Sequence, residues 1–254
     1  MELRTDADSR AMEVAGAPQG ERMQIPARFA DPEDPPRELS GWKWGVLVSL
    51  GVLTILSLAR LVVAVDLNST AGEEGDVIAA YDTYSVWSGL HALLSLLCAG
   101  VFIAWFFQAY KNLRRLGVHN MRYGNGWAIG AWFIPIFNLF RPKQIANDIW
   151  RGSERGVDVA TQWRQVAVPS LLHWWWGLFL AQNILTQVGQ GMVESGHDKL
   201  IGAGSFSSGL SQIESGTVVD ILGGVCTIAA AFLAIMVVSR ISDRLDEVRS
   251  DVLG

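Results

Sequence analysis

Lysine and arginine are almost absent from two stretches of this 254-residue sequence, 66–84 and 189–217, which contain only Lys199. Arg60 is the one basic residue inside a long apolar run, and the other 18 basic residues fall within 1–43, 108–125, 141–165 and 240–254. Long apolar runs alternate with these basic stretches. This segregation is typical of a multi-pass membrane protein whose basic loops face the cytoplasm. We therefore expect a protein of the cell (plasma) membrane with both termini cytoplasmic.

Cysteine is also scarce. Cys98 and Cys226 both fall in apolar runs, and no Cys-x-x-Cys or Cys/His ligand spacing is present, so neither a disulfide framework nor a zinc site is indicated. The HExxH, GxSxG and P-loop motifs of common hydrolases and nucleotide-binding proteins are absent as well. The sequence therefore predicts no catalytic, cofactor-binding or metal-ligating residue and does not favour an enzyme.

Charged residues make up only 18% of the chain, against roughly 25% in soluble domains. Four apolar runs reach the about 20 residues that a membrane-spanning helix needs: about 44–65, 86–107, 166–188 and 218–238. The helix of the second run is expected to extend from near Asp76 to Leu116, because Gly117 follows a basic last turn. The sequence predicts an all-α membrane protein with four transmembrane helices, the membrane domain covering 41–240.

A fifth apolar run, 126–140, is too short to cross the bilayer as a helix. At 1.5 Å per residue it covers about 22 Å of a core roughly 30 Å thick, and it contains Pro135. Basic stretches flank it on both sides, so a crossing here would place one of them outside. We therefore predict a short re-entrant or interfacial segment between the second and third spans, followed by an amphipathic interfacial helix over 142–151.

Three residues of this short run have expected structural roles. Asn138 is expected to hydrogen-bond backbone groups freed by the break or to cap the helix that follows. Gly126 and Gly130 are expected to allow close approach of another helix.

The remaining segments are polar. Residues 1–40 hold five of the eight prolines, nine acidic residues and five arginines, which predicts a disordered cytoplasmic tail, either a solvated leader or a contact for a protein partner. Residues 241–254 are expected to form a second cytoplasmic tail. The stretch 189–217 is rich in glycine and serine, and it predicts an external loop.

A dense aromatic motif runs from Trp105 to Trp150, with the sequence WFFQAYKNLRRLG, a short spacer and then GWAIGAWFIPIFNLFRPKQIANDIW. It resembles the signature of a bacterial membrane family, domain of unknown function 4328, which is common in actinobacteria. The matching positions are Trp105, Tyr110, Asn112, Leu116, Gly117, Gly126, Trp127, Ala128, Gly130, Trp132, Phe133, Pro135, Asn138, Pro142, Asp148 and Trp150, with Trp174–Trp176 in the next run. The resemblance extends over 80–240 and implies a multi-pass membrane protein with no assigned activity.

Three ionisable residues lie within or at the edge of apolar runs, at similar shallow depth near the outer side: Arg60, His91 and Asp220. Charged groups in membranes are costly and often functional. Arg60 is expected either to snorkel to the interface or to pair with Asp220, and the alternative is a transport or proton-handling role. His173, near the cytoplasmic end of the 166–188 run, is expected to be an interface residue.

Tryptophan is abundant, with 11 residues, and aromatic belts at the membrane interfaces are the main interpretation. The alternative is a Trp-lined ligand pocket around Trp132 and Trp174–Trp176. The basic stretches are expected to contact anionic lipid headgroups at the inner face rather than nucleic acid. The favoured function is a non-catalytic membrane module that binds a partner or a lipid. The alternatives are a small transporter or channel that uses the broken 126–142 segment, and an intramembrane enzyme acting on lipid.

Overall fold

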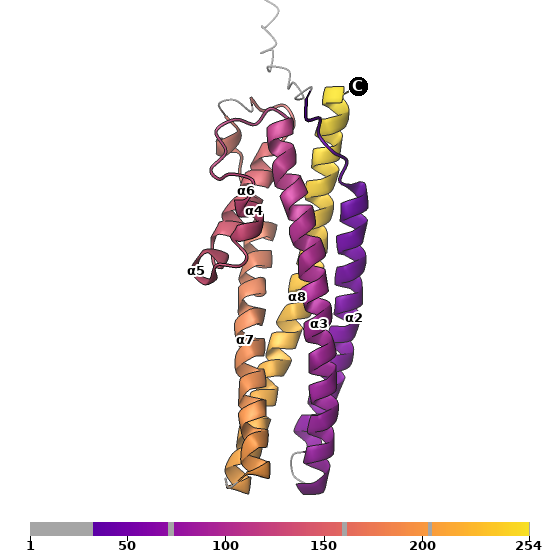
Figure 1. Cartoon of the computed structure of the whole chain (residues 1–254), viewed down its shortest axis with the longest axis vertical. Coiled ribbons are helices and arrows are strands. Elements are labelled where there is room, and N and C mark those ends of the chain that lie inside the picture. Colours follow the sequence, from indigo (N-terminus) through magenta and orange to yellow (C-terminus); the bar gives the residue numbers. More distant parts are fainter. Residues whose placement is uncertain (1–32, 71–73, 159–161, 203–204, 254) are drawn as a thin grey trace, which may run out of the picture.

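The computed structural model describes residues 33–70, 74–158, 162–202 and 205–253. Within this part of the chain the structure is helical and contains no strand, as the sequence predicted. Its body is a bundle of four long helices that run antiparallel to their neighbours along the chain (Figure 1). These helices are α2 (Ser40–Thr70), α3 (Glu74–Arg115), α7 (Ser170–Ile201) and α8 (Phe206–Leu253).

Three segments of these helices are long and apolar enough to cross a membrane: Ser40–Thr70, Val77–Arg115 and Phe206–Leu253. They indicate a membrane protein. α7 does not reach the same hydropathy, because polar side chains such as Gln182 and Asn183 interrupt its apolar sequence.

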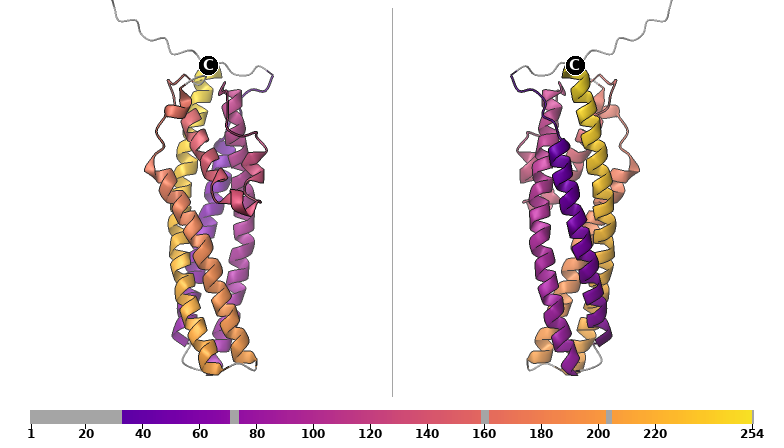
Figure 2. Two further views of the ribbon diagram at one scale, coloured as in Figure 1. Left: turned by 90° about the vertical axis from the view of Figure 1, so that its left-hand side faces the viewer. Right: turned by 90° about the vertical axis from the view of Figure 1, so that its right-hand side faces the viewer.

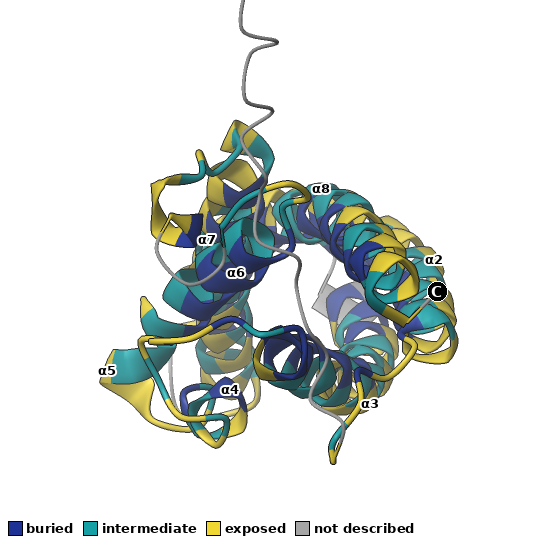
Figure 3. Cartoon of the chain, turned by 90° about the horizontal axis from the view of Figure 1, so that it is seen from above, coloured by how far each residue is buried: buried dark blue, intermediate teal, exposed yellow. Residues whose placement is uncertain are grey.

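The four long helices form a ring that is loosely closed on one side. α7 packs along α8, α8 along α2, and α2 along α3, as the two side views in Figure 2 show. α3 and α7 complete the ring without such close backbone approach (Figure 3). α2 begins and α8 ends at the same end of the bundle, where the Leu39 N–H donates to the Asp246 carboxylate over 3.0 Å.

The end of α3 follows the sequence prediction closely. Gly117 adopts a left-handed backbone with φ 78°, which glycine accepts without steric cost. Its N–H donates to the Arg114 carbonyl over 3.0 Å, and the Val118 N–H donates to the Leu113 carbonyl over 3.0 Å. This pair of hydrogen bonds is a Schellman motif, which satisfies carbonyls that the helix end would otherwise leave free.

The segment between α3 and α7 folds against the end of the bundle where α2 begins and α8 ends (Figure 1). It contains two single-turn helices, α4 (Trp127–Gly130) and α5 (Pro135–Asn138), then α6 (Arg141–Gly152) and a 3-10 turn, η2 (Trp163–Gln165). The predicted break at Pro135 is present, and α6 begins within one residue of its predicted start. α6 is amphipathic and buries Ile145, Ala146 and Ile149.

Two expectations for this segment are wrong. Asn138 does not cap α6: Phe140 occupies the N-cap position without a side-chain cap, and Asn138 Oδ1 is buried with no hydrogen-bond partner among the described residues. Hydrogen bonds within the backbone turns satisfy backbone groups near the break instead. The Asn138 N–H, for example, donates to the Ile134 carbonyl over 2.8 Å. A Cβ atom at Gly126 or Gly130 would meet nothing within 4 Å, so no helix packs closely on either glycine.

Within the stretch 189–217, residues 189–201 and 206–217 are helical, which corrects the prediction of a loop there. Residues 189–201 continue α7, and 206–217 begin α8. Five glycines in and just after this stretch are spaced seven residues apart on each helix: Gly189 and Gly196 on α7, and Gly209, Gly216 and Gly223 on α8. A Cβ at Gly189 would lie 2.5 Å from the Asp220 nitrogen, and one at Gly216 would lie 2.8 Å from the Val193 nitrogen. The glycines therefore allow the two backbones to pack in direct contact, as small residues do in membrane helix pairs.

The segment next to α2 is also ordered where it is described. Residues 33–39 lie across α3 and α8, because the Asn112 side chain accepts the Arg37 N–H over 3.1 Å and donates to the Arg37 carbonyl over 2.6 Å. Arg115 donates to Asp34 over 2.6 Å and lowers the pKa of that carboxyl to about 2. The predicted tail is therefore wrong for 33–39, and residues 1–32 lie outside the described part.

The C-terminal stretch was expected to be a tail from residue 241 onward. It instead continues α8 as far as Leu253, because Ile241, Leu245 and Val248 remain buried against the bundle.

We expect Gly189→Ala to lower the melting temperature of the purified protein. Its Cβ would meet the α8 backbone, which cannot move aside like a flexible side chain, and overpacking of this kind costs about 1–3 kcal/mol. Gly191→Ala is the matched control, because Gly191 is exposed on the same helix with nothing within 4 Å of its Cβ position. Equal melting temperatures for the two variants would contradict direct backbone packing of α7 on α8.

Candidate functional site

Arg60 and Asp220 form a buried ion pair between α2 and α8. Arg60 Nη2 lies 2.5 Å from Asp220 Oδ2, and the two side chains are 4% and 0% exposed. Tyr84 of α3 donates its hydroxyl to the same carboxylate oxygen over 3.0 Å, and Arg60 Nε donates to Ser88 over 3.1 Å. The predicted pairing is thus confirmed, and the pair also binds α3. A buried pair is stable only with such additional hydrogen bonds.

The ion pair lies further from the helix ends than the sequence predicted. The prediction placed Arg60 about five residues before the outer end of its helix. α2 instead continues to Thr70, which places Arg60 about 15 Å from that end. Snorkelling would carry the guanidinium to the surface, whereas this one is buried in the bundle.

His91 lies one helical turn after Ser88 on α3 and forms a hydrogen bond with Ser57 of α2. Its Nε2 atom is 3.0 Å from Ser57 Oγ, and Ser57 donates its only hydroxyl proton to the Leu53 carbonyl over 2.7 Å. His91 Nε2 is therefore assigned as the donor, which leaves Nδ1 as an acceptor.

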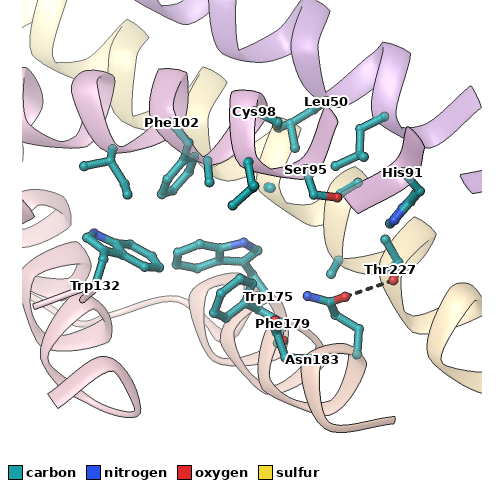
Figure 4. A pocket seen from close by; sticks show the side chains of 18 residues that line it. Leu50, His91, Ser95, Cys98, Phe102, Trp132, Trp175, Phe179, Asn183 and Thr227 are labelled. Carbon is teal, nitrogen blue, oxygen red and sulfur yellow. Dashed lines mark hydrogen bonds between the residues drawn. The ribbon is translucent and has the colours of Figure 1, made fainter. Parts of the chain in front are cut away.

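A cavity of about 330 Å³ lies next to His91, which is one of its lining residues. Side chains from α2, α3, α7 and α8 surround it. Figure 4 shows aromatic side chains at one end, among them Phe102, Trp132 and Trp175, and polar ones at the other, among them Asn183 and Thr227. Gln182 also lines it and accepts a hydrogen bond from Thr227 over 3.0 Å. None of the described residues that line the cavity is a lysine, arginine, aspartate or glutamate.

The cavity reaches the surface of the bundle. Leu96 and Ala99 of α3 line it, yet Leu96 is 72% exposed and Ala99 is exposed as well. The opening therefore lies on the α3 side of the loosely closed wall between α3 and α7.

Trp132 closes one end of the cavity. It comes from the turn between α4 and α5 and packs edge-on against Phe102 and Phe106 of α3, with ring centroids 5.7 and 5.8 Å apart. Trp176 of α7 lies 6.1 Å away on the other side and donates its indole N–H to the Leu139 carbonyl over 3.1 Å. Trp132 thus anchors the turn between α4 and α5 in the space between α3 and α7, whose backbones do not pack closely.

Trp175 is the other motif residue that lines the cavity, and several further motif residues lie outside it. The Arg141 guanidinium stacks over Trp127 at 3.8 Å, and that of Arg244 stacks over Trp150 at 4.0 Å. Asp148 on α6 is buried 3.9 Å from Arg122, and burial raises the pKa of its carboxyl. Pro142 is the second residue of α6, where its missing N–H leaves no hydrogen bond unmade.

Some predicted positions stay apart from the cavity, and some cavity residues were missed. His173 is exposed at the start of α7 and does not line the cavity. Ser95, Gln182, Asn183 and Thr227 were not singled out from the sequence, although Gln182 and Asn183 interrupt an apolar run. No group of three or more metal-ligating side chains occurs in the residues that the structure describes.

We expect Asp220→Asn to destabilise the protein by about 3–5 kcal/mol, because it leaves Arg60 buried without a counter-charge. The double variant Arg60→Met with Asp220→Asn should recover much of that loss, measured as melting temperature in detergent. Asp243→Asn is the control: it breaks the exposed pair with Lys43 (2.7 Å) and should cost less than about 1 kcal/mol. A double variant as unstable as Asp220→Asn alone would contradict a structural ion pair.

Comparison with known sequences places this site within a family. Residues 68–243 match the family described as Domain of unknown function (DUF4328), a range that includes the aromatic motif, Asp220 and most of the cavity, but not Arg60. No curated protein and no solved structure matches the chain. Because the match extends over more than half of its length, the chain belongs to the family described as Domain of unknown function (DUF4328).

Proposed function

We propose that this protein is a four-span membrane protein that holds one lipid-derived amphiphile in the cavity between α3 and α7, and that it acts by binding. The observation that carries the proposal is the cavity. It has aromatic and aliphatic walls, a polar end and an opening at Leu96 and Ala99. Ligand sites are typically of this kind, largely apolar with a few polar groups. An opening in the side of a membrane bundle faces acyl chains, which gives a lipid direct access.

The packing of α7 supports its role as the fourth span. It lies antiparallel to α8, which has 48 residues and a length of about 72 Å, far more than the roughly 30 Å of a bilayer core. Gln182 and Asn183 lower the hydropathy of α7 but line the cavity, where membrane helices usually place polar residues.

The orientation follows from the distribution of charge. Basic residues concentrate at the end of the bundle where α2 begins and α8 ends, which favours a cytoplasmic location for that end. The segment 126–140 lies near the same end and exposes large apolar side chains, with Phe133 73% and Ile136 68% exposed. In this orientation the segment enters the inner leaflet as a re-entrant or interfacial element, and the basic residues meet anionic headgroups.

Cysteine labelling in intact cells tests the topology. In a variant with Cys98→Ala and Cys226→Ala, an impermeant thiol reagent should label Ser207→Cys and spare His119→Cys and Arg155→Cys. All three positions are exposed. Labelling at 155 but not at 119 would show that 126–140 crosses the membrane, and the four-span proposal would then be wrong.

Native mass spectrometry of the purified protein tests the cavity. We expect a co-purified lipid on the native protein and its loss in Ala99→Phe, whose ring would fill the opening. Ala92→Phe is the matched control, because Ala92 is exposed on the same helix and does not line the cavity. Retention of the lipid by Ala99→Phe, with both variants folded, would contradict the proposal.

A further inference from the structure

The cavity presents hydrogen-bonding groups that no described residue uses. The Ser95 hydroxyl and the Trp175 indole N–H line it, and neither bonds to another described residue. Thr227 shares its single hydroxyl proton between the Gln182 carbonyl at 3.0 Å and the Gly223 carbonyl at 2.9 Å, and no described residue accepts a hydrogen bond from the amide N–H groups of Gln182. Among the donors of the lining residues, only the Trp132 indole N–H is fully buried without a partner among the described residues, which costs free energy unless a ligand or water accepts its hydrogen bond. The donors of Ser95, Trp175 and Gln182 are not fully buried. They suit a ligand with acceptor oxygens.

Two acceptors lie at the polar end of the same cavity. Asn183 donates its N–H to the Phe179 carbonyl over 2.7 Å, which leaves its own oxygen free. His91 retains Nδ1 as an acceptor. A ligand with oxygens that accept hydrogen bonds in one form and donate them in another would match both sets of groups.

The head of the ligand must be uncharged. The described lining has no lysine, arginine, aspartate or glutamate, and Arg60, on the neighbouring part of α2, is already paired with Asp220. A phosphate or carboxylate placed here would lose its hydration without gaining a counter-ion, which is strongly unfavourable. Ordinary phospholipids and fatty acids therefore fit poorly.

The walls of the cavity favour a flat ring. Phe102 of α3 and Trp175 of α7 are in direct contact, with ring centroids 6.0 Å apart and planes tilted by 40°, and together with Phe179 they form one aromatic wall against which a ring can pack. Aromatic side chains pack best against other rings, either offset or edge-on. The cavity volume of about 330 Å³ is near the lower end of the about 300–1,000 Å³ of small-molecule sites, so it holds a ring head and the start of a tail.

We infer that the amphiphile is an isoprenoid quinone, with its ring in the cavity and its tail passing Leu96 and Ala99 into the bilayer. A quinone is neutral and planar, its two carbonyl oxygens accept hydrogen bonds, and the corresponding hydroxyls of the quinol donate them. Ser95 and Trp175 supply donors to the oxidised form, and Asn183 and His91 supply acceptors to the reduced form. This inference rests on the proposed function and names the ligand of the same cavity.

Titration of the purified full-length protein with decylubiquinone, and separately with a menaquinone that has two isoprene units, tests the inference. We expect saturable quenching of tryptophan fluorescence and a rise in melting temperature with at least one quinone. Ser95→Ala and Trp175→Phe should each raise Kd about fivefold, the effect of losing one hydrogen bond. Ser85→Ala is the control, because Ser85 is exposed on α3 away from the cavity and should leave Kd unchanged.

Decanoate serves as the competing probe, because it is a charged amphiphile without a ring. Decanoate binding as tight as quinone binding, or quinone binding unaffected by Ala99→Phe, would overturn the inference. If neither quinone binds saturably while Ala99→Phe still removes a co-purified lipid, the inference fails and the proposed lipid-binding function stands. If no quinone binds and no lipid co-purifies with the folded protein, both fail.

Discussion

Asp220 is the residue at which all four long helices meet. Its carboxylate binds Arg60 of α2 and Tyr84 of α3, and its backbone lies so close to α7 that a Cβ on Gly189 would be 2.5 Å from the Asp220 nitrogen. The carboxylate is stable in the bundle because of the guanidinium and hydroxyl that it binds. Glycine provides the space in which α7 reaches the same point. The relative positions of the helices therefore depend on one residue of α8 and its three neighbours.

This arrangement explains why a cavity forms where it does. The glycines draw α7 onto α8, and α2 lies between α8 and α3, so α3 and α7 remain apart. Side chains bridge them at two levels: Tyr81 stacks on His197 with ring centroids 3.6 Å apart, and at the other level Phe102 contacts both Trp175 and Trp132. The cavity lies between these two levels. The aromatic motif thus forms one end wall of the cavity, and the broken helix around Pro135 lets a single indole enter between two helices.

The sequence predicted those features that depend on local pattern or on a large energetic cost. Hydropathy identified the long helices, and Gly117 marked the end of α3. The cost of a lone buried charge indicated that Arg60 needs Asp220. The stretch 189–217 was wrongly predicted, because a glycine-rich sequence is typical of a loop unless the helix that packs against the glycines is known. The seven-residue spacing of several of these glycines is nevertheless visible in the sequence. The cavity could not be predicted, because it depends on which helices fail to touch.

One face of α3 connects the ion pair to the cavity. Tyr84, Ser88, His91, Ser95 and Phe102 recur at intervals of four, three, four and seven residues, so they share a single helical face. Along this face the hydrogen bonds change in kind. The hydroxyls of Tyr84 and Ser88 form hydrogen bonds within the ion-pair network. His91 forms a hydrogen bond through one ring nitrogen, and the Ser95 hydroxyl forms none with a described residue. The polar groups near Asp220 therefore stabilise the bundle, whereas those nearer the aromatic motif remain available to a ligand.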